Sequence, residues 1–256
     1  MIVVHEFNDG GHSIRITESL RDGARRYFDG PALYTEVDVN GENRLGYIAA
    51  MERQMTGASN LLLLGTAGGA LATRFSRAGR AVTAIDNRAT VFEIARNWFQ
   101  MPAEVECICA DAVDFLRSNT RRWDAVAVDI FRGTEIPDSM FAAEVGEALR
   151  RAVAPGGVVV WNVADSQNAW PVYVIRRIMR VAGFVPEVVP VLDMDIGNTL
   201  VVCRADLAPP SPTVGGSRPG LGSPSANHVP EVARLARNLR SVLQAQSTPP
   251  RPRSAH

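Results

Sequence analysis

The amino-acid sequence, 256 residues long, contains no lysine, so all 27 of its basic side chains are arginines. Chemistry that needs a lysine, such as Schiff-base formation or a lysine general base, is therefore excluded. The four histidines, His5, His12, His228 and His256, all lie outside the central part of the chain. We therefore expect neither histidine-assisted catalysis nor a metal site there, and a general base would have to be a carboxylate, a tyrosine or water.

Cysteine is scarce, and long apolar runs are missing. Two of the three cysteines, Cys107 and Cys109, lie one residue apart in an expected strand, which is typical of small buried side chains rather than of a disulfide or a metal site. No run approaches the roughly 18 apolar residues of a membrane span, and the first residues carry no basic segment ahead of an apolar one. The sequence thus predicts a soluble cytoplasmic protein without a membrane partner.

The formal net charge is zero, but the charges are unevenly spread. Residues 207–256 carry six arginines and one glutamate, which leaves the rest of the chain with a net charge of −5. An acidic main body does not suggest a nucleic-acid surface. Because 46% of the residues are hydrophobic, the chain can build a substantial core.

The N-terminal residues 1–42 are expected to form a small β-hairpin subdomain, because 13–17 and 32–39 alternate apolar and polar residues between Gly/Asp clusters. The large domain, 43–206, begins with an amphipathic helix pattern over 43–55.

The C-terminal tail, 207–256, changes composition abruptly. Residues 208–226 are almost entirely Pro, Ser, Gly and Ala, which cannot bury a core and predict disorder. A short amphipathic helix is expected over 230–244, either docked on the protein or a second subunit or left unattached.

Strand and helix patterns alternate through the large domain, which predicts an α/β fold with a doubly wound, Rossmann-like parallel sheet. Pro155, Gly156 and Gly157 form a breaker that is expected to set the start of the fifth strand. The last two strands are joined by only a short loop and are therefore antiparallel, giving seven strands with one reversed. The expected strands are 61–64, 81–85, 105–109, 125–128, 158–162, 185–192 and 199–204.

A glycine turn follows the first of these strands, where four leucines lead into Gly65, Gly68 and Gly69. Such a turn delivers the chain to a ligand at a helix N-terminus. Asp86 ends the next strand, where a ribose diol would lie, and Asp111 ends the third, where an adenine amino group could donate to it. The pattern predicts an adenosine site, although either acid could instead be a helix N-cap.

These motifs resemble the spermidine-synthase-like branch of the class I S-adenosylmethionine-dependent methyltransferase fold. The resemblance runs from about residue 13 to 206, and its order and spacing are more specific than any single motif. It is carried by the stretches LLLLGTAGGAL, AIDNRATVFEIARNWF, CADAVDFL, WDAVAVDIFRGTEIP and LRRAVAPGGVVVWN.

The resemblance implies a role for each matching residue. Gly65 and Gly68 would form the turn under the nucleoside, Asp86 would bind the ribose, and Asp111 with its neighbour Ala112 would bind the adenine. Asp129 matches the carboxylate that takes a proton from the attacking amine in aminopropyltransferases. It ends the fourth strand beside the topological switch point, although capping the next turn is the alternative role.

Two departures from the family's pattern bear on the substrate. Ala67 replaces an acid that holds the amine of decarboxylated S-adenosylmethionine, and Arg132 replaces an acid that grips the polyamine. Arg132 would repel a polycationic acceptor and could bind the carboxylate of an intact methionine tail. The remaining candidates for contact with the acceptor are Tyr34, Tyr47 and Glu135.

The function expected from the sequence is methyl transfer from S-adenosyl-L-methionine to a small-molecule nucleophile, with Asp129 as base. Aminopropyl transfer from decarboxylated S-adenosylmethionine is the alternative within the enzyme class. A non-catalytic nucleoside-binding scaffold is the alternative outside it. Dimers are common in the family, so a homodimer is possible, but neither the acceptor nor the oligomeric state can be read from the sequence.

Overall fold

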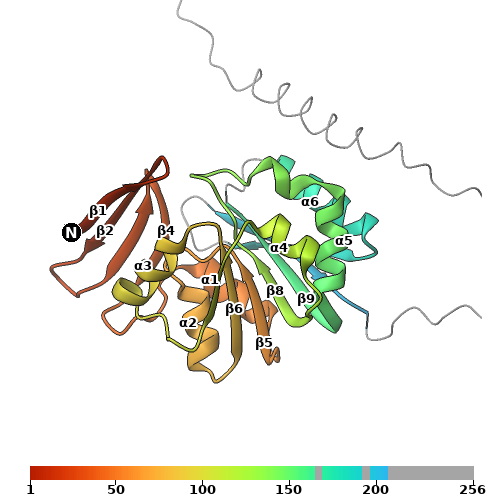
Figure 1. The fold of residues 1–256 in the computed structure, drawn as a ribbon, viewed down its shortest axis with the longest axis horizontal. Helices are drawn as coiled ribbons and strands as arrows, with labels where there is room; N and C mark the ends of the chain where they lie inside the picture. The colour runs from red at the N-terminus through yellow and green to blue at the C-terminus, as the bar shows by residue number, and fades with distance from the viewer. Residues whose placement is uncertain (165–168, 192–196, 207–256) are drawn as a thin grey trace, which may run out of the picture.

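A computed structural model describes residues 1–164, 169–191 and 197–206 of the chain. Within these ranges the chain forms a four-stranded sheet from its N-terminal residues and a seven-stranded sheet from the remainder (Figure 1). The C-terminal segment 207–256, with its expected disorder and helix, lies outside the described residues. In the described ranges, no helix is long and apolar enough to cross a membrane.

The large sheet is the doubly wound sheet that the sequence predicts. Its strand order is β10-β11-β9-β8-β5-β6-β7, with parallel pairing from β9 to β7 and antiparallel pairing of β11 with both of its neighbours. The expectation of one reversed strand among seven is thereby confirmed. The strands are β5 (Asn60–Leu64), β6 (Ala81–Asp86), β7 (Glu106–Cys109), β8 (Trp123–Val128), β9 (Val153–Ala164), β10 (Val185–Val191) and β11 (Asn198–Arg204).

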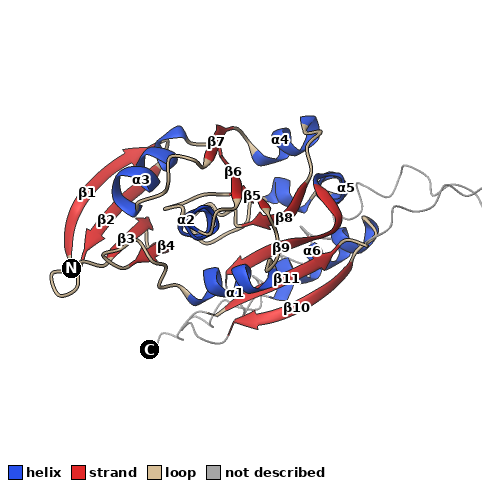
Figure 2. Ribbon diagram, turned by 90° about the horizontal axis from the view of Figure 1, so that it is seen from below, coloured by secondary structure: helices blue, strands red, loops and turns tan. Residues whose placement is uncertain are grey.

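Helices cover both faces of this sheet (Figure 2). On one face lie α1 (Gly46–Gln54), α2 (Ala70–Arg77) and α3 (Ala89–Phe99), and on the other lie α4 (Ala112–Ser118), α5 (Ala143–Ala152) and α6 (Ala169–Val181). A short 3-10 helix, Asp138–Phe141, precedes α5.

The leucine run of β5 is explained by this double cover. Leu61 and Leu63 belong to the core on the α1–α3 side, and Leu62 and Leu64 to the core on the α4–α6 side. Alternate side chains of a strand point to opposite faces, so a strand with both faces buried has no position for a polar residue.

The N-terminal sheet consists of β1 (Ile2–Asp9), β2 (His12–Glu18), β3 (Arg25–Asp29) and β4 (Ala32–Val37), paired antiparallel in chain order. The expected hairpin region is present, but β1 and β3 were not expected. The pattern does not reveal β1 because it is an edge strand without a fully buried residue.

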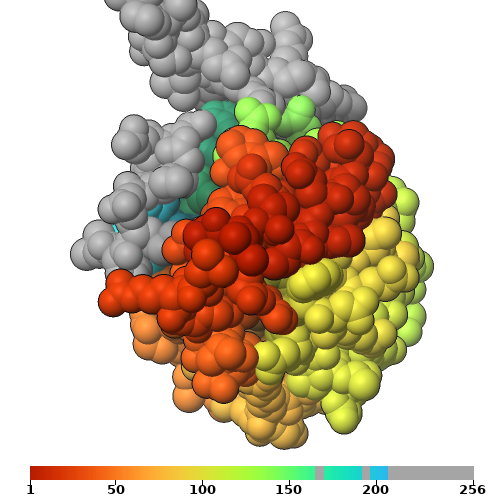
Figure 3. Space-filling model, turned by 90° about the vertical axis from the view of Figure 1, so that its left-hand side faces the viewer, coloured from red at the N-terminus to blue at the C-terminus, as the bar shows by residue number. Residues whose placement is uncertain are grey.

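The N-terminal sheet packs on α3, as the contact between the red and yellow surfaces in Figure 3 shows. The rings of His5 and Trp98 stack with their centroids 5.4 Å apart, and Arg25 donates a hydrogen bond of 3.0 Å to the Trp98 carbonyl. Thr90 donates from its hydroxyl to Asp9. These contacts fix the small sheet against the large domain.

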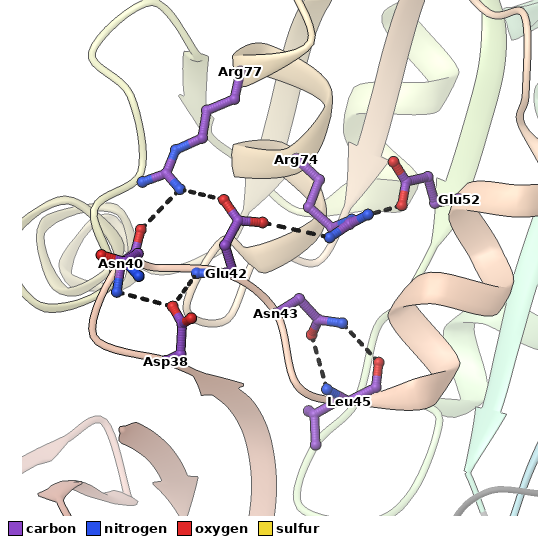
Figure 4. A network of polar contacts seen from close by, with 8 residues as sticks. All are labelled: Asp38, Asn40, Glu42, Asn43, Leu45, Glu52, Arg74 and Arg77. Atoms are coloured by element: carbon purple, nitrogen blue, oxygen red, sulfur yellow. Dashed lines mark hydrogen bonds and ion pairs between the residues drawn. The ribbon is translucent and has the colours of Figure 1, made fainter. Parts of the chain in front are cut away.

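The connection from β4 to α1 is held by a polar network on α2 (Figure 4). Arg77 binds Glu42 at 2.8 Å, and Arg74 bridges Glu42 at 3.6 Å and Glu52 at 2.6 Å. The side chain of Asp38 accepts two backbone N–H bonds within the linker. Single exposed ion pairs contribute little, but a shared network restrains the linker that carries the N-terminal sheet.

The expected start of the fifth strand is wrong. Strand β9 already begins at Val153, and Pro155, Gly156 and Gly157 lie within it as an irregularity in the pairing with β8. A Cβ on Gly157 would lie 2.6 Å from the Asp124 carbonyl oxygen. Gly157 thus allows β9 to lie close to β8, and this segment is not a turn between two elements.

The turn after β5 lies directly against the end of β8. Gly65 has φ +87°, and a Cβ there would lie 2.2 Å from the Asp129 carbonyl oxygen. The Asp129 N–H donates to the Leu64 carbonyl at 2.8 Å. Position 65 therefore requires glycine for both its backbone conformation and its space.

We predict that Gly65→Ala lowers the free energy of unfolding by about 3 kcal/mol or more, because the strained φ is combined with a backbone collision. The matched control is Gly57→Ala, with φ +89° and no atom within 4 Å of the added Cβ, for which only the conformational cost of about 1–2 kcal/mol is expected. Urea denaturation measures both. Equal losses would show that the contact with Asp129 does not constrain the turn.

Candidate active site

One cavity of about 660 Å³ lies between the N-terminal sheet and the end of the large sheet where the parallel strands terminate. It lies at the topological switch point, where β6 and β7 extend from β5 on one side and β8 and β9 on the other. Open α/β sheets bind ligands at this place. Of the expected site residues, the cavity is lined by Tyr34, Tyr47, Gly65, Ala67, Asp86, Asp111, Ala112, Asp129 and Arg132.

The glycine turn contributes Gly65, Thr66 and Ala67 to the cavity wall. Ala67 has φ +45°, an uncommon conformation for a residue with a side chain. Gly68 is not part of the wall. Its N–H donates to the Thr35 hydroxyl at 2.9 Å, and a Cβ there would collide with the Thr35 side chain. Gly68 is therefore where β4 packs on the turn.

Asp86 ties the turn to the end of β6. One carboxylate oxygen accepts the Thr66 N–H at 3.0 Å and the other accepts the Arg88 N–H at 3.2 Å. Arg88, not Asp86, is the N-cap residue of α3, so the helix-cap alternative for Asp86 is not what the structure shows. Burial raises the pKa of the Asp86 carboxyl, while these backbone hydrogen bonds act in the opposite direction.

Asp111 does act as a helix cap. Its Oδ1 accepts the backbone N–H groups of Val113 and Asp114 at 2.8 and 3.1 Å, at the start of α4. Both capping bonds use the same oxygen, and Asp111 also lines the cavity beside Ala112. The cap and the proposed contact with adenine are therefore compatible.

Asp129 is the buried carboxylate of the site. Its Oδ1 accepts a hydrogen bond of 2.8 Å from the Asn162 amide, and its Oδ2 lies 3.4 Å from the Tyr47 hydroxyl, which donates to it. Burial raises the pKa of Asp129 to about 6, although both hydrogen bonds lower it. A carboxyl group with a pKa in this range can accept a proton near neutral pH.

Two tyrosines connect Asp129 to the N-terminal sheet and to the loop after β8. The Tyr47 hydroxyl, on α1, also lies 3.2 Å from the Tyr34 carbonyl, and the Tyr34 hydroxyl donates to the Gly133 carbonyl at 2.8 Å. Burial raises the pKa of both tyrosines, so each remains a neutral donor. Tyr34 thereby joins the small sheet to the loop that carries Arg132.

Arg132 and Glu135 pair through their backbones in a narrow turn of that loop. Arg132 is exposed but lines the cavity, whereas Glu135 does not line it. Arg132 therefore borders the cavity, and the expected role of Glu135 as a cavity carboxylate is not supported by its position.

The N-terminal sheet also brings a histidine to the cavity, where the sequence led us to expect none. His12 Nδ1 lies 2.5 Å from Asp29 Oδ2, and the Arg88 guanidinium lies 3.7 Å from the same buried carboxylate oxygen. Both His12 and Arg88 line the cavity. The sequence did not predict this arrangement, because the antiparallel pairing that places His12 at the cavity joins separate segments and leaves no local sequence pattern.

Asn162 and Asn198 are two further cavity residues that sequence reasoning missed. Asn162 lies near the end of β9, Asn198 begins β11, and both side chains are buried. A polar residue next to a run of buried apolar ones was the available signal, because burial of an amide is costly unless it is hydrogen-bonded.

The raised pKa of Asp129 predicts how stability depends on pH. In the unfolded chain its pKa is about 4, so the folded state binds the proton more tightly, and stability falls as pH rises from about 4 through the folded value near 6. The loss is up to about 3 kcal/mol for two pKa units. We predict that Asp129→Asn lacks this loss and is more stable than wild type at pH 8, as measured by denaturation at pH 4, 6 and 8. Parallel curves for the two proteins would contradict the assignment.

No protein-family model matches the chain. Among curated proteins, it is 31% identical over 107 residues to a polyamine aminopropyltransferase of Chromobacterium violaceum, and 29% identical over 108 residues to that of Neisseria meningitidis serogroup A. Each match covers 41% of this chain and 41% of the relative, so the chain spans less than half of the length of these relatives.

Solved structures resemble a larger part of the chain. A probable spermidine synthase from Corynebacterium glutamicum covers 80% of it and matches over 81% of its own length, with a TM-score of 0.68 and 18% identity. Spermidine synthase from Thermotoga maritima covers 80%, over 74% of its own length, with a TM-score of 0.64 and 13% identity. The N-methyltransferase NodS from Bradyrhizobium japonicum covers 62% of this chain and matches over 94% of its own, with a TM-score of 0.51 and 20% identity. The chain therefore has the spermidine-synthase-like form of the methyltransferase fold.

Proposed function

We propose that this protein is a transferase that moves an aminopropyl group from decarboxylated S-adenosylmethionine to a small amine. The observation that carries the proposal is the extent of the likeness: spermidine synthases match 80% of the chain, whereas the methyltransferase matches 62%. The sequence relatives of known name are likewise polyamine aminopropyltransferases. This evidence favours aminopropyl transfer over the methyl transfer that the sequence alone led us to place first.

The cavity residues fit an adenosyl sulfonium nucleoside. Asp86 would accept from the ribose hydroxyls, and Asp111 from the adenine amino group. The turn from Gly65 to Ala67 would lie under the nucleoside, and Asp129 would face the sulfonium end. A volume of about 660 Å³ lies within the range of small-molecule sites and leaves room for an acceptor.

The reaction would need alignment and removal of one proton. The acceptor nitrogen attacks the aminopropyl carbon bonded to sulfur, a C–N bond forms, and the C–S bond breaks with its electron pair going to sulfur, which becomes a neutral thioether. Asp129 takes the proton that the nitrogen loses. The sulfonium is already an activated leaving group, so the residues of this chain supply orientation and the base.

Methyl transfer from intact S-adenosylmethionine is the second candidate, and two observations favour it. Ala67 lines the cavity at the position of an acid that would hold the amine of the decarboxylated nucleoside in the family that this chain resembles. Arg132 lines the same cavity and can pair with the carboxylate of an intact methionine tail.

A nucleoside-binding protein without turnover is the candidate outside the enzyme class. Turnover separates this candidate from the other two, because a binding protein retains affinity but yields no product. Mass spectrometry of a reaction with a panel of small amines identifies the transferred group directly from the mass added to the acceptor.

We predict that Asp129→Asn keeps the fold while lowering turnover at saturating nucleoside about 100-fold or more, because the amide preserves the shape of the carboxylate but cannot take the proton. The control is Asp124→Asn, whose carboxylate accepts backbone N–H groups at the opposite end of β8. Wild-type turnover in Asp129→Asn would remove Asp129 from the mechanism.

Competitive titration of the two nucleosides distinguishes the two transfer reactions. For an aminopropyltransferase, we predict that wild type binds decarboxylated S-adenosylmethionine more tightly and that Ala67→Asp increases this preference about tenfold through a new charge pair. Preference for the intact nucleoside, lost in Arg132→Ala, would establish the second candidate. Absence of binding by either nucleoside would overturn both.

A further inference from the structure

Two buried asparagines form consecutive hydrogen bonds that end at Asp129. The Asn198 amide nitrogen donates to Asn162 Oδ1 at 2.8 Å, and the Asn162 amide nitrogen donates to Asp129 Oδ1 at 2.8 Å. Asn162 is 3% exposed and Asn198 7%. Asp129 directly follows β8, Asn162 lies in β9 and Asn198 begins the reversed strand β11, so the pairing of these three strands brings the side chains together.

The negative charge of Asp129 sets the donor-to-acceptor direction of these two hydrogen bonds. An ionised carboxylate can only accept hydrogen bonds, so Asn162 must present its N–H₂ group to Asp129 and its carbonyl to Asn198. Asn198 must then present its own N–H₂ group. Without the hydrogen bond from Asn198 to Asn162 Oδ1, the Asn162 amide could rotate and present this oxygen, an acceptor, to Asp129.

We infer that Asn198 and Asn162 form a positioning relay that orients the carboxylate of Asp129 and keeps it ready to accept a proton from the acceptor. Asn162 acts directly on Asp129, and Asn198 acts through Asn162. The role in catalysis rests on the proposed function, whereas the effect on the protonation of Asp129 does not.

Other titratable groups lie around Asp129. Tyr47 on α1 is the titratable group in hydrogen-bond contact with it among the described residues, and it donates to the other oxygen. Tyr34 on β4 contacts Tyr47 through its carbonyl. The charged or titratable groups that line the same cavity from other elements are His12, Asp86, Arg88, Asp111 and Arg132.

The test is a pH titration of the Asp129 carboxyl carbon by NMR, with its signal assigned by its loss in Asp129→Asn. Asn162→Leu, similar in shape but without a donor, should raise the pKa of Asp129 by on the order of one unit. Asn198→Leu should raise it by a smaller amount. In the double variant, the pKa should equal that of Asn162→Leu alone, because Asn198 has no effect without Asn162.

Thr199→Val is the matched control, a buried polar residue beside Asn198 on β11 that does not line the cavity. It should leave the pKa of Asp129 unchanged even if it alters stability. If Asn198→Leu does not fold, Asn198→Ala removes the same donor and carries the same expectation.

An unchanged pKa in the folded Asn198 variant, or additive shifts in the double variant, would overturn the relay. Where wild type is active, the acid limb of its pH–rate profile should move upward with the titration in each variant. If wild type shows no turnover while the titration behaves as expected, the relay stands and the proposed function fails.

Discussion

The site depends on one close approach, that of the turn after β5 to the end of β8. Gly65 leaves no room for a side chain against the Asp129 carbonyl, and the Asp129 N–H is bound to the Leu64 carbonyl. The same contact places the turn that is expected to lie under a nucleoside next to Asp129, the carboxylate that is expected to take a proton. Asp86 holds the turn from its other side through Thr66. The backbone of three neighbouring strands thereby fixes the spacing on which the proposed chemistry depends.

A buried carboxylate in this position costs stability, and the surrounding residues offset only part of the cost. Burial raises the pKa of Asp129 to about 6, whereas Tyr47 and Asn162 lower it by donating to its two oxygens. An acid stabilised fully by ion pairs would remain charged and be a poor base, and one left without donors would remain protonated. The intermediate value is typical of a group that exchanges protons near neutral pH, and such groups concentrate at functional sites.

The sequence predicts the parts of the site that depend on local pattern. Asp86 and Asp129 close apolar strands, so their place at the edge of the sheet follows from strand order alone. Local sequence pattern does not predict the residues that reach the site through the pairing of segments far apart in the sequence. His12 reaches the cavity through an N-terminal sheet whose edge strand has no buried face, and Asn198 meets Asn162 through the register of the reversed strand. The Pro155–Gly157 segment predicts a turn but lies within β9, because a close strand approach requires glycine as a turn does.

The central claim is that the cavity holds an adenosyl sulfonium nucleoside with its positive centre beside Asp129. Calorimetry at pH 5 and pH 8 with the sulfonium nucleoside and its uncharged thioether analogue tests it most directly. Because Asp129 must be ionised to attract the cation, affinity for the sulfonium form should rise about tenfold between these pH values, and that for the thioether should not. The rise should disappear in Asp129→Asn. The same pH dependence for both ligands, or a rise that persists in the variant, would contradict the account.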